Sequence, residues 1–493
     1  MSNTPQPSGK KPARPTIKAV RGTRDLLPAE TPLWNRVEAT ARAVFSRYGF
    51  GEIRTPIFES TELFARGVGE ETDIVSKEMF TWEDRGRAAS ERDASLTLRP
   101  ENTAGVVRAY IEHNLDKTGA LQKLYYIGPQ FRRERPQRGR YRQFWQIGAE
   151  VIGPQSSGSE SPLRDAEVLE MLASFLDELG VRGWKLELNS VGSAEDRARY
   201  NLALREALAP VKDKLCPDNQ RRAETNPLRV LDSKDEADQE IINALPKIAD
   251  YLSPDSRAHF AAVLAALDAC KVAYTLNPRL VRGLDYYTRT TFEFTVPSGD
   301  ATGLGTQNAL LGGGRYDGLS EMLGGPRAPG IGFAIGEDRL ILTLQAQHEA
   351  DVATQEDCHP ERSAEREVEG SASGTTTKPG APPQSSGGPS IARSLRDGWG
   401  AEKLDAYIAP LGLAQNPAAL ALAKELRTSG LTVEVGDGSF KLRKSFDIAD
   451  TLARHIILLG EDEVATNTTT VKTFATGEQT KVQRTALVAA LRT

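Results

Sequence analysis

Cysteine, histidine and methionine are scarce in this chain of 493 residues, which has three cysteines, five histidines and four methionines. Cys216, Cys270 and Cys358 are far apart, odd in number and form no Cys-x-x-Cys pair. The sequence therefore predicts neither a disulfide framework nor a zinc site, and a reducing compartment fits these cysteines. The histidines are equally scattered, so we expect no metal site built from side chains.

Long apolar runs and an excess of basic charge are also missing. No apolar run approaches the ~18 residues that a transmembrane helix needs, and the N-terminus has no apolar signal-peptide core. We therefore expect a cytoplasmic protein with no membrane partner. The net charge of −5 argues against a generally basic coat. Any nucleic acid must then be met by local basic patches.

Two common nucleotide-binding motifs are absent. The chain has no Gly-x-x-x-x-Gly-Lys-Ser/Thr sequence, which excludes a P-loop. The glycine-rich run at 330–336 is one residue off the dinucleotide fingerprint, and no βαβ unit with an acidic residue ~20 positions on follows it. A Rossmann fold is therefore excluded as well.

Composition divides the chain into four parts. Residues 1–16 are rich in Pro, Lys and Ser and predict a disordered tail, and residues 347–402 predict a low-complexity linker with little apolar content. Residues 17–346 predict one domain, with a mostly helical insertion at about 194–275. Residues 403–493 alternate strands and helices and predict a small α/β domain.

An amphipathic helix is predicted near the start of the large domain. Thr31 would cap it, Pro32 would occupy its first position, and Gly49 would end it. Its apolar residues recur at helical spacing and indicate a core or subunit-interface face: Trp34, Val37, Ala41, Val44, Phe45 and Tyr48.

The most informative stretch is 124–152, which predicts two strands joined by an arginine-rich turn. Strand side chains alternate between two faces. In residues 143–152 one face is apolar and the other carries Gln146, Gly148 and Glu150. In residues 124–133 the polar face carries Arg132. Paired as an antiparallel hairpin, the strands would present Arg132, Gln146 and Glu150 on one floor.

A surface sheet with a solvated polar face would show the same alternation. Two details argue against that interpretation. The turn at 132–142 holds six arginines, more than a hairpin turn needs. Gly148 gives up side-chain packing between two polar residues, which indicates that something approaches the strand there.

Other polar and glycine-rich segments flank predicted strands. Residues 101–103 (Glu-Asn-Thr) stand at a strand-to-helix corner, where ligand groups are often placed, although plain helix capping explains them equally well. Glycines 312–314 interrupt a strand, where they are costly, so we expect a ligand or a second backbone against them. The block 280–289 contains Arg282 and two tyrosines, and Arg339 stands in the first turn of a helix after the run 330–336.

Taken together, these motifs resemble the class II aminoacyl-tRNA synthetases, and among them the histidyl-tRNA synthetase family. Residues 128–150 look like motif 2, residues 330–341 with Arg339 look like motif 3, and the stretch ending at Pro56 looks like motif 1. Residues 280–288 and 311–318 are similar to the two histidine-specific motifs of that family. The resemblance covers roughly 19–342 and 404–491, and the linker is not part of the family pattern.

The resemblance implies an α+β fold: a six-stranded antiparallel active-site sheet flanked by helices, a helical insertion and a C-terminal α/β anticodon-binding domain. It implies a homodimer that uses ATP with Mg²⁺. L-histidine would be activated to histidyl-adenylate and then transferred to the 3′ end of tRNA(His), releasing AMP and diphosphate. Guanidinium groups suit the first step, because the carboxylate and the α-phosphate are both anions that must be brought together.

Each predicted role falls on particular residues. The catalytic guanidiniums would be Arg132 and Arg282. Histidine would be bound by Glu101, Asn102, Thr103, Gln146, Glu150, Tyr286 and Tyr287, although core packing is the more favoured explanation of Tyr286. ATP would be bound by Arg132, Gly312, Gly313, Gly314 and Arg339. The acceptor end of the tRNA would be met by Arg135, Gln137 and Arg138.

Two other classes of protein could carry part of this pattern. One is a non-catalytic paralogue that serves as the regulatory subunit of ATP phosphoribosyltransferase in histidine biosynthesis. It should lack the C-terminal domain and the arginine of the Arg-Gly-Leu-Asp block, and this chain has both. The other is an RNA-binding module, which would not need three in-strand glycines beside Arg282.

Overall fold

The computed structural model describes residues 16–69, 72, 74–84, 95–281, 286–297, 308–357 and 403–492. The predicted tail to residue 15, Arg282 and residues 358–402 of the predicted linker lie outside these residues. Residues 347–357 of that linker continue the long helix α10 (Glu337–Asp357).

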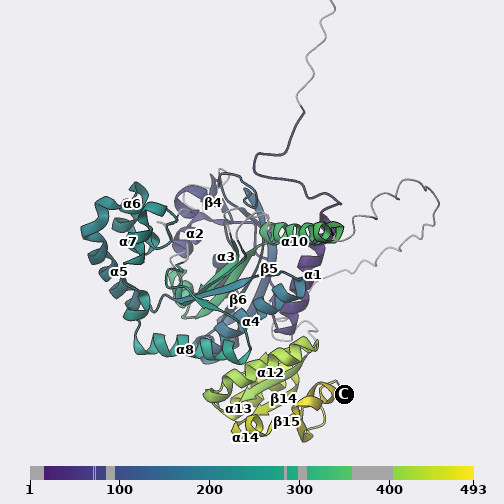
Figure 1. Cartoon of the computed structure of the whole chain (residues 1–493). Helices are drawn as coiled ribbons and strands as arrows, with labels where there is room; N and C mark the ends of the chain where they lie inside the picture. Colours follow the sequence, from purple (N-terminus) through teal and green to yellow (C-terminus); the bar gives the residue numbers. More distant parts are fainter. Residues whose placement is uncertain are drawn as a thin grey trace, which may run out of the picture.

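An eight-stranded sheet forms the centre of the molecule, in the order β1-β5-β6-β11-β10-β9-β7-β8 (Figure 1). Its six middle strands are antiparallel throughout, as the resemblance implies, and the two-residue strands β1 and β8 pair in parallel at the edges. The strands are β1 (Gly51–Glu52), β5 (Gln122–Phe131), β6 (Gln143–Ile152), β7 (Lys185–Ser190), β8 (Thr275–Leu276), β9 (Thr288–Thr295), β10 (Ala309–Arg315) and β11 (Gly330–Gly336).

Helices α1 (Thr31–Arg47) and α4 (Pro162–Leu179) pack on the apolar face of this sheet. The Phe45 ring lies 5.5 Å from that of Tyr125 on β5 and 5.8 Å from that of Phe333 on β11. The apolar stripe of α1 is therefore core. The helix starts one position earlier than predicted, with Glu30 rather than Thr31 at the N-cap. The sheet's opposite face is left for polar groups.

Shorter elements stand beside that polar face. A three-stranded sheet in the order β2-β4-β3 is formed by β2 (Phe58–Ser60), β4 (Ser95–Leu98) and β3 (Phe80–Glu83). Helix α3 (Thr103–Glu112) follows β4 and contacts α2 (Thr61–Val68) and α9 (Leu319–Met322). The corner at residues 99–102 between β4 and α3 thereby faces the hairpin of β5 and β6.

The segment between β7 and β8 is mostly helical, as predicted. Helices α5 (Ala194–Leu208), α6 (Pro217–Thr225) and α7 (Gln239–Asn243) surround a small core of their own, and α8 (Pro254–Ala269) returns the chain to the sheet. Figure 1 shows α5 to α7 on the side of the molecule away from α1. Helices α5 to α7 are therefore an addition to the sheet, whereas α8 packs against α4 in the main core.

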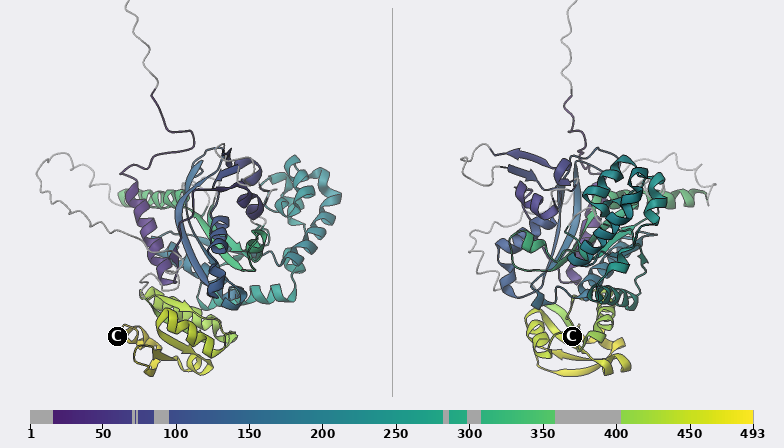
Figure 2. Two further views of the ribbon diagram at one scale, coloured as in Figure 1. Left: turned by 180° about the vertical axis from the view of Figure 1, so that it is seen from behind. Right: turned by 90° about the vertical axis from the view of Figure 1, so that its left-hand side faces the viewer.

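Residues 403–492 form a second α/β unit at one end of the molecule (Figure 2). Its sheet has the order β13-β12-β14-β15-β16. The elements are β12 (Leu404–Pro410), α12 (Asn416–Thr428), β13 (Val433–Val435), α13 (Leu442–Leu452), β14 (Ala453–Leu459), α14 (Glu461–Thr466), β15 (Thr468–Thr473), β16 (Gln479–Gln483) and α15 (Leu487–Ala490). The sequence predicts one helix over residues 442–455, but α13 ends at Leu452 because β14 takes the next residues, and neither α14 nor β16 was predicted.

Buried ion pairs join this unit to the central sheet at the first turn of α4. Arg164 Nη1 contacts Glu434 Oε1 on β13 at 3.2 Å, and Arg427 Nη2 on α12 contacts Glu167 Oε1 at 2.7 Å. Lys123 on β5 bridges Glu434 at 2.6 Å and Glu167 at 3.0 Å. Burial alone would raise the pKa of Glu167, but the charges of Lys123, Arg427 and Arg164 lower it well below its usual range.

One residue along, Asp165 connects α4 to the strand that carries the glycines. Arg315 Nε at the end of β10 donates to Asp165 Oδ1 at 3.0 Å, and His259 Nε2 on α8 lies 2.8 Å from Asp165 Oδ2. Burial would raise the pKa of Asp165, but Arg315 and His259 outweigh it and lower that pKa. On its other side the His259 ring contacts Arg289, with 3.1 Å between Nδ1 and the Arg289 Nη1. Among the described helices, none combines the length and apolar content needed to cross a bilayer.

Candidate active site

A cavity of about 300 Å³ opens over the polar face of the hairpin. Strands β5 and β6 pair as the predicted antiparallel hairpin, with Gly128 opposite Gln146 and Leu124 opposite Glu150. Arg132 and Gln146 line the cavity, together with residues of β10, β11 and the corner before α3. The polar face of the hairpin is thus the floor of a pocket, and the alternative of a solvated surface sheet is wrong.

The corner before α3 supplies a carboxylate to this cavity. Glu101 accepts the backbone N–H groups of Thr103 at 2.8 Å and Ala104 at 3.0 Å, so it caps α3 as well as lining the pocket. Burial raises the pKa of Glu101, while these N–H groups lower it. Asn102 points away from the pocket, and its Oδ1 accepts from the Thr55 hydroxyl at 2.6 Å. Thr103 and Glu101 therefore face the pocket, while Asn102 stabilises the corner from behind.

Tyrosines form the deeper end of the cavity. Tyr286 and Tyr287 both line it, with ring centroids 4.8 Å apart, and Tyr316 meets Tyr286 edge-on at 5.9 Å. Tyr286 also belongs to the apolar cluster around α3 and Ile152, so it packs in a core and borders the pocket at once. Gln146 presents a buried Oε1 with no hydrogen-bond partner among the described residues. An aromatic hollow with an unused amide acceptor is suited to a small polar ligand.

Glu150 lies just behind this hollow and is fully buried. Its carboxyl oxygens accept the hydroxyls of Thr103 at 2.7 Å and Tyr316 at 2.6 Å. Burial raises the pKa of Glu150 to about 8, and the charge of Glu101 adds to the rise, while the hydrogen bonds from Tyr316 and Thr103 lower this pKa. The carboxyl group is therefore largely neutral at pH 7 in the ligand-free protein.

The glycines near the pocket make room mostly for the protein's own groups. A Cβ on Gly148 would lie 2.4 Å from the Tyr126 phenol, so the group that approaches this strand is Tyr126. A Cβ on Gly313 would lie 2.1 Å from the Gly332 carbonyl oxygen, which is the close second backbone that the sequence predicted. Gly314 accommodates the Tyr287 ring. Gly312 is the one of the three β10 glycines that lines the cavity.

The other end of the cavity is lined by guanidinium groups and one aromatic ring. Arg132 lies over the Phe144 ring at 5.3 Å, and its Nε donates to the Pro100 carbonyl at 2.9 Å. Arg339 donates to the Ala309 carbonyl at 3.0 Å from the first turn of α10. Burial lowers the pKa of Arg339, as does the nearby charge of Arg140. Two fixed cations beside a flat ring suit a nucleotide with its phosphates.

The remaining predicted residues lie at the edge of this site or outside the described chain. Arg135, Gln137 and Arg138 stand in the turn between β5 and β6, where Gln137 and Arg140 form an isolated bridge. Gly139, Arg140 and Tyr141 of the same turn line the pocket. The turn therefore connects the pocket to the surface. Arg282 falls outside the described residues.

Sequence analysis missed several residues that line the cavity. These are Tyr126, Glu134, Tyr141, Phe144, Glu293, Tyr316 and Asp338. Phe144 shares the alternating face with Gln146, so the same pattern could have identified it. Glu293 lies on β9 opposite Gly312, and only the strand order brings it to the site.

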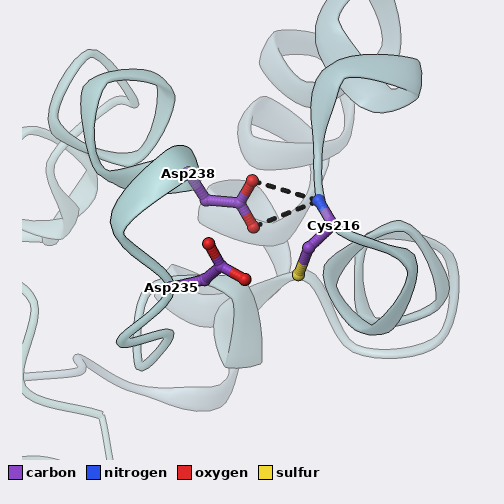
Figure 3. A group of neighbouring side chains, drawn as sticks. All are labelled: Cys216, Asp235 and Asp238. Carbon is purple, nitrogen blue, oxygen red and sulfur yellow. Dashed lines mark hydrogen bonds between the residues drawn. The ribbon is translucent and has the colours of Figure 1, made fainter.

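A separate group of Cys216, Asp235 and Asp238 in the insertion is the one cluster of three potential metal ligands among the described residues (Figure 3). Both oxygens of Asp238 accept the Cys216 N–H, at 3.0 and 3.3 Å, and Oδ2 accepts the Asn219 amide at 2.6 Å. The hydrogen bond with Asp238 raises the pKa of the Cys216 thiol, which disfavours a thiolate ligand. The Asp238 carboxylate therefore holds the residues at the start of α6 in place.

The cavity faces an antiparallel hairpin that presents one arginine, and a neighbouring strand that runs into a helix headed by a second. This is the catalytic architecture of the class II aminoacyl-tRNA synthetases, here with a C-terminal α/β domain. The model of the histidyl-tRNA synthetase family matches residues 22–340, and that of the anticodon binding domain matches residues 405–493.

Individual relatives agree with these matches. The chain is 61% identical over 477 residues to the histidine–tRNA ligase of Koribacter versatilis (strain Ellin345), which covers 97% of this chain and 96% of that protein. It is 49% identical to the histidine–tRNA ligase of Solibacter usitatus (strain Ellin6076), covering 96% and 99%. A crystal structure of apo histidyl-tRNA synthetase from S. aureus has a TM-score of 0.54 and 35% identity, covering 97% and 100%. The chain belongs to the histidyl-tRNA synthetase family.

Proposed function

We propose that this chain is a histidine–tRNA ligase. The observation that carries the proposal is the cavity itself, which has an aromatic hollow with the Glu101 carboxyl group at one end and two arginines with a ring at the other. Such a pocket matches an amino acid with a basic side chain placed next to a nucleotide. A regulatory paralogue is not favoured, because the relatives named as ligases cover almost the whole chain and the anticodon-binding domain is present.

Histidine would lie in the aromatic hollow. Glu101, Thr103 and Gln146 would bind its α-ammonium group, while Glu150 and Tyr287 would bind the imidazole nitrogens. A neutral Glu150 can donate to an imidazole nitrogen or become ionised against an imidazolium, so either tautomeric arrangement is served. Polar groups aimed at both nitrogens would reject apolar amino acids by ~10⁴, because those ligands would leave the buried groups unpaired. Asn102 and Tyr286 would shape the wall.

ATP would lie at the arginine end. Arg339 would stack on the adenine opposite Phe144, and Gly312 would let the nucleotide approach β10. Gly313 and Gly314 would leave room for the Gly332 carbonyl and the Tyr287 ring. Arg132 and Arg282 would bind the α-phosphate and the substrate carboxylate. In the first step a carboxylate oxygen of histidine bonds to the α-phosphorus and the bond to diphosphate breaks. The guanidiniums hold the two anions in line, and no side chain has to take a proton.

In the second step a hydroxyl of the tRNA 3′-terminal ribose attacks the carbonyl carbon of histidyl-adenylate, and AMP leaves. Arg135, Gln137 and Arg138 in the exposed turn would position the acceptor end by contacting phosphates. The carboxylates Glu134 and Glu293 line the arginine end, and their oxygens fit Mg²⁺, which prefers one or two carboxylates together with phosphate oxygens. The ion would neutralise phosphate charge when bound.

We further propose a homodimer in the cytoplasm. The family resemblance implies the dimer, and Ile57, Phe58 and Trp82 expose 45, 53 and 40% of their surface around the small β2-β4-β3 sheet. Sedimentation velocity should give a mass of two chains, and the Trp82→Glu variant should shift that mass toward one chain.

The few, unpaired cysteines favour a reducing compartment. The domain boundaries we propose are 17–346 and 403–493.

The test of the function is histidine-dependent exchange of pyrophosphate into ATP. We expect wild-type exchange, and a loss of about 10²–10³ in Arg282→Ala and Glu150→Ala, the size of one well-aimed donor. Arg327→Ala is the matched control, because Arg327 is an exposed arginine that pairs with Glu160. Wild-type protein without exchange would reject the proposed activity. Exchange that survives both active-site changes would reject the assigned residues instead.

A further inference from the structure

The segment before α1 lies against the arginine turn of the hairpin. The Arg142 N–H in the turn donates to the Gly22 carbonyl at 2.7 Å, while the Arg142 carbonyl accepts from the Arg132 N–H at 2.9 Å. Gly22 has φ +91°, and a Cβ there would meet Arg142 and Pro136 atoms at 2.8 to 2.9 Å. The segment is therefore a third backbone alongside the hairpin, and only glycine fits at this contact.

Arg24, two residues on, connects this segment to both sides of the nucleotide end. Its Nη1 donates to Glu30 at 2.8 Å and its Nη2 donates to Asp338 Oδ1 at 3.1 Å. The guanidinium carbon lies 5.1 Å from the Tyr141 ring centroid and 5.5 Å from that of Trp34. A single planar cation thus contacts the turn, α1 and the start of α10.

Asp338 extends the connection into the sheet. Its Oδ2 accepts the Trp145 N–H on β6 at 3.1 Å. Asp338 directly precedes Arg339, and both residues line the cavity, as does Tyr141. Arg24 itself does not line it. Any influence of Arg24 on the cavity is therefore exerted through the ring of Tyr141 and the carboxylate of Asp338.

We propose that Arg24 is a positioning residue for ATP, which holds Tyr141 and the first turn of α10 in the places that bind the nucleotide. The inference rests on the proposed ATP site. Arginine is required rather than lysine, because a planar guanidinium can donate along two fixed directions while its face stacks on rings. A lysine ammonium can pair with two carboxylates, as Lys123 does, but it has no planar face to lie against the Tyr141 and Trp34 rings at the same time.

The experiment measures pyrophosphate exchange as a function of ATP and of histidine in Arg24→Lys, Arg24→Ala and the control Arg21→Ala. Arg21 is in the same segment, is exposed, and its side chain forms no hydrogen bond or ion pair with the described residues. We expect the KM for ATP to rise on the order of tenfold in both Arg24 variants. The KM for histidine should stay within about twofold, and Arg21→Ala should match the wild type.

A Tyr141→Leu variant tests the route of the effect. If Arg24 acts through Tyr141, the double variant Arg24→Lys/Tyr141→Leu should raise the KM for ATP no further than the larger single change. Two results would overturn the proposal: Arg24 variants that keep the wild-type KM for ATP, or a parallel change in both KM values with a lowered unfolding temperature in Arg24→Lys. If the wild type shows no exchange, the proposed activity fails, which is a different result.

Discussion

Two sets of buried carboxylates in this molecule are accommodated in opposite ways. At the first turn of α4, Asp165 and Glu167 are surrounded by cations, which keep their pKa values low. At the bottom of the cavity, Glu150 has only hydroxyl donors, and its pKa rises to about 8. The charges of Asp165 and Glu167 are therefore compensated by cations of the protein. Glu150 has no ion-pair partner among the described residues, and a basic ligand can supply the missing positive charge.

The difference separates groups that stabilise the fold from groups that bind. A buried ion pair tolerates loss of neither partner, since the remaining charge is stranded in a low dielectric. A carboxyl group that is already neutral can be replaced by an amide at little cost to folding, yet it cannot be replaced for binding. Each prediction below alters one side of this contrast, in order of decreasing effect on stability.

Removing the cation beside Asp165 should have the largest effect on stability. Arg315→Met leaves Asp165 without its main partner, so we expect a loss of about 3–5 kcal/mol in the free energy of unfolding, measured by urea denaturation. Arg327→Met is the control, because an exposed pair contributes about 0–1 kcal/mol. An equal loss in the two variants would show that the ion pair between Arg315 and Asp165 does not stabilise the fold.

Glu337 is another buried carboxylate, and its replacement should change stability in the opposite direction. Neither of its oxygens has a hydrogen-bond partner among the described residues, and burial raises its pKa to about 9. The folded protein keeps this proton while the unfolded chain releases it near pH 4.5, so stability falls as pH rises through that window up to about 9. Glu337→Gln should add about 3 kcal/mol at pH 7 and nothing at pH 4. Thermal unfolding across pH 4 to 9 checks this.

The exposed Glu62, which pairs with Arg66 on the surface, provides the comparison for Glu337. Glu62→Gln should leave the pH dependence unchanged. A Glu337→Gln profile that runs parallel to the wild type would show that Glu337 is ionised in the folded protein.

Glu150→Gln should have the smallest effect on stability and a large one on activity. Because the folded pKa of about 8 exceeds the unfolded value, the wild type loses stability between about pH 4.5 and 8, and the amide removes that slope. We expect a gain of about 1–2 kcal/mol at pH 7, reduced by poorer hydrogen bonds to Thr103 and Tyr316. Isothermal titration should show histidine binding weakened by at least about tenfold. A destabilised variant with intact binding would reverse the contrast.

Alternation along the strands was enough to predict the hairpin and its polar floor, because the side-chain period depends only on local sequence. Helix α1 and the helical insertion followed from spacing in the same way. The sequence could not indicate that Gly332 makes room for the Glu150 carboxyl, because those residues become neighbours only when β11 pairs with β6. The same limit applies to Glu293 and Arg24, which reach the site through tertiary packing.

Boundaries were less predictable than the elements themselves. The helix predicted to His455 ends at Leu452, because residues 453–459 pair with β12 and β15. The position of the C-terminal unit could not be predicted from the sequence either. In the sequence Lys123, Arg164 and Glu434 look like ordinary surface charges, and only the fold buries them together.

The buried ion pairs between α4 and the C-terminal unit also limit how easily that unit can be separated from the rest of the chain. A chain cut before residue 403 would keep Lys123, Arg164 and Glu167 but would lose Glu434, Arg427 and the Val435 carbonyl that Arg164 contacts. Three charged side chains selected for a sealed environment would then face water. Any descendant that discards the terminal unit must therefore rewrite these positions too, so the two halves of this protein can be separated by evolution only in a coordinated series of substitutions.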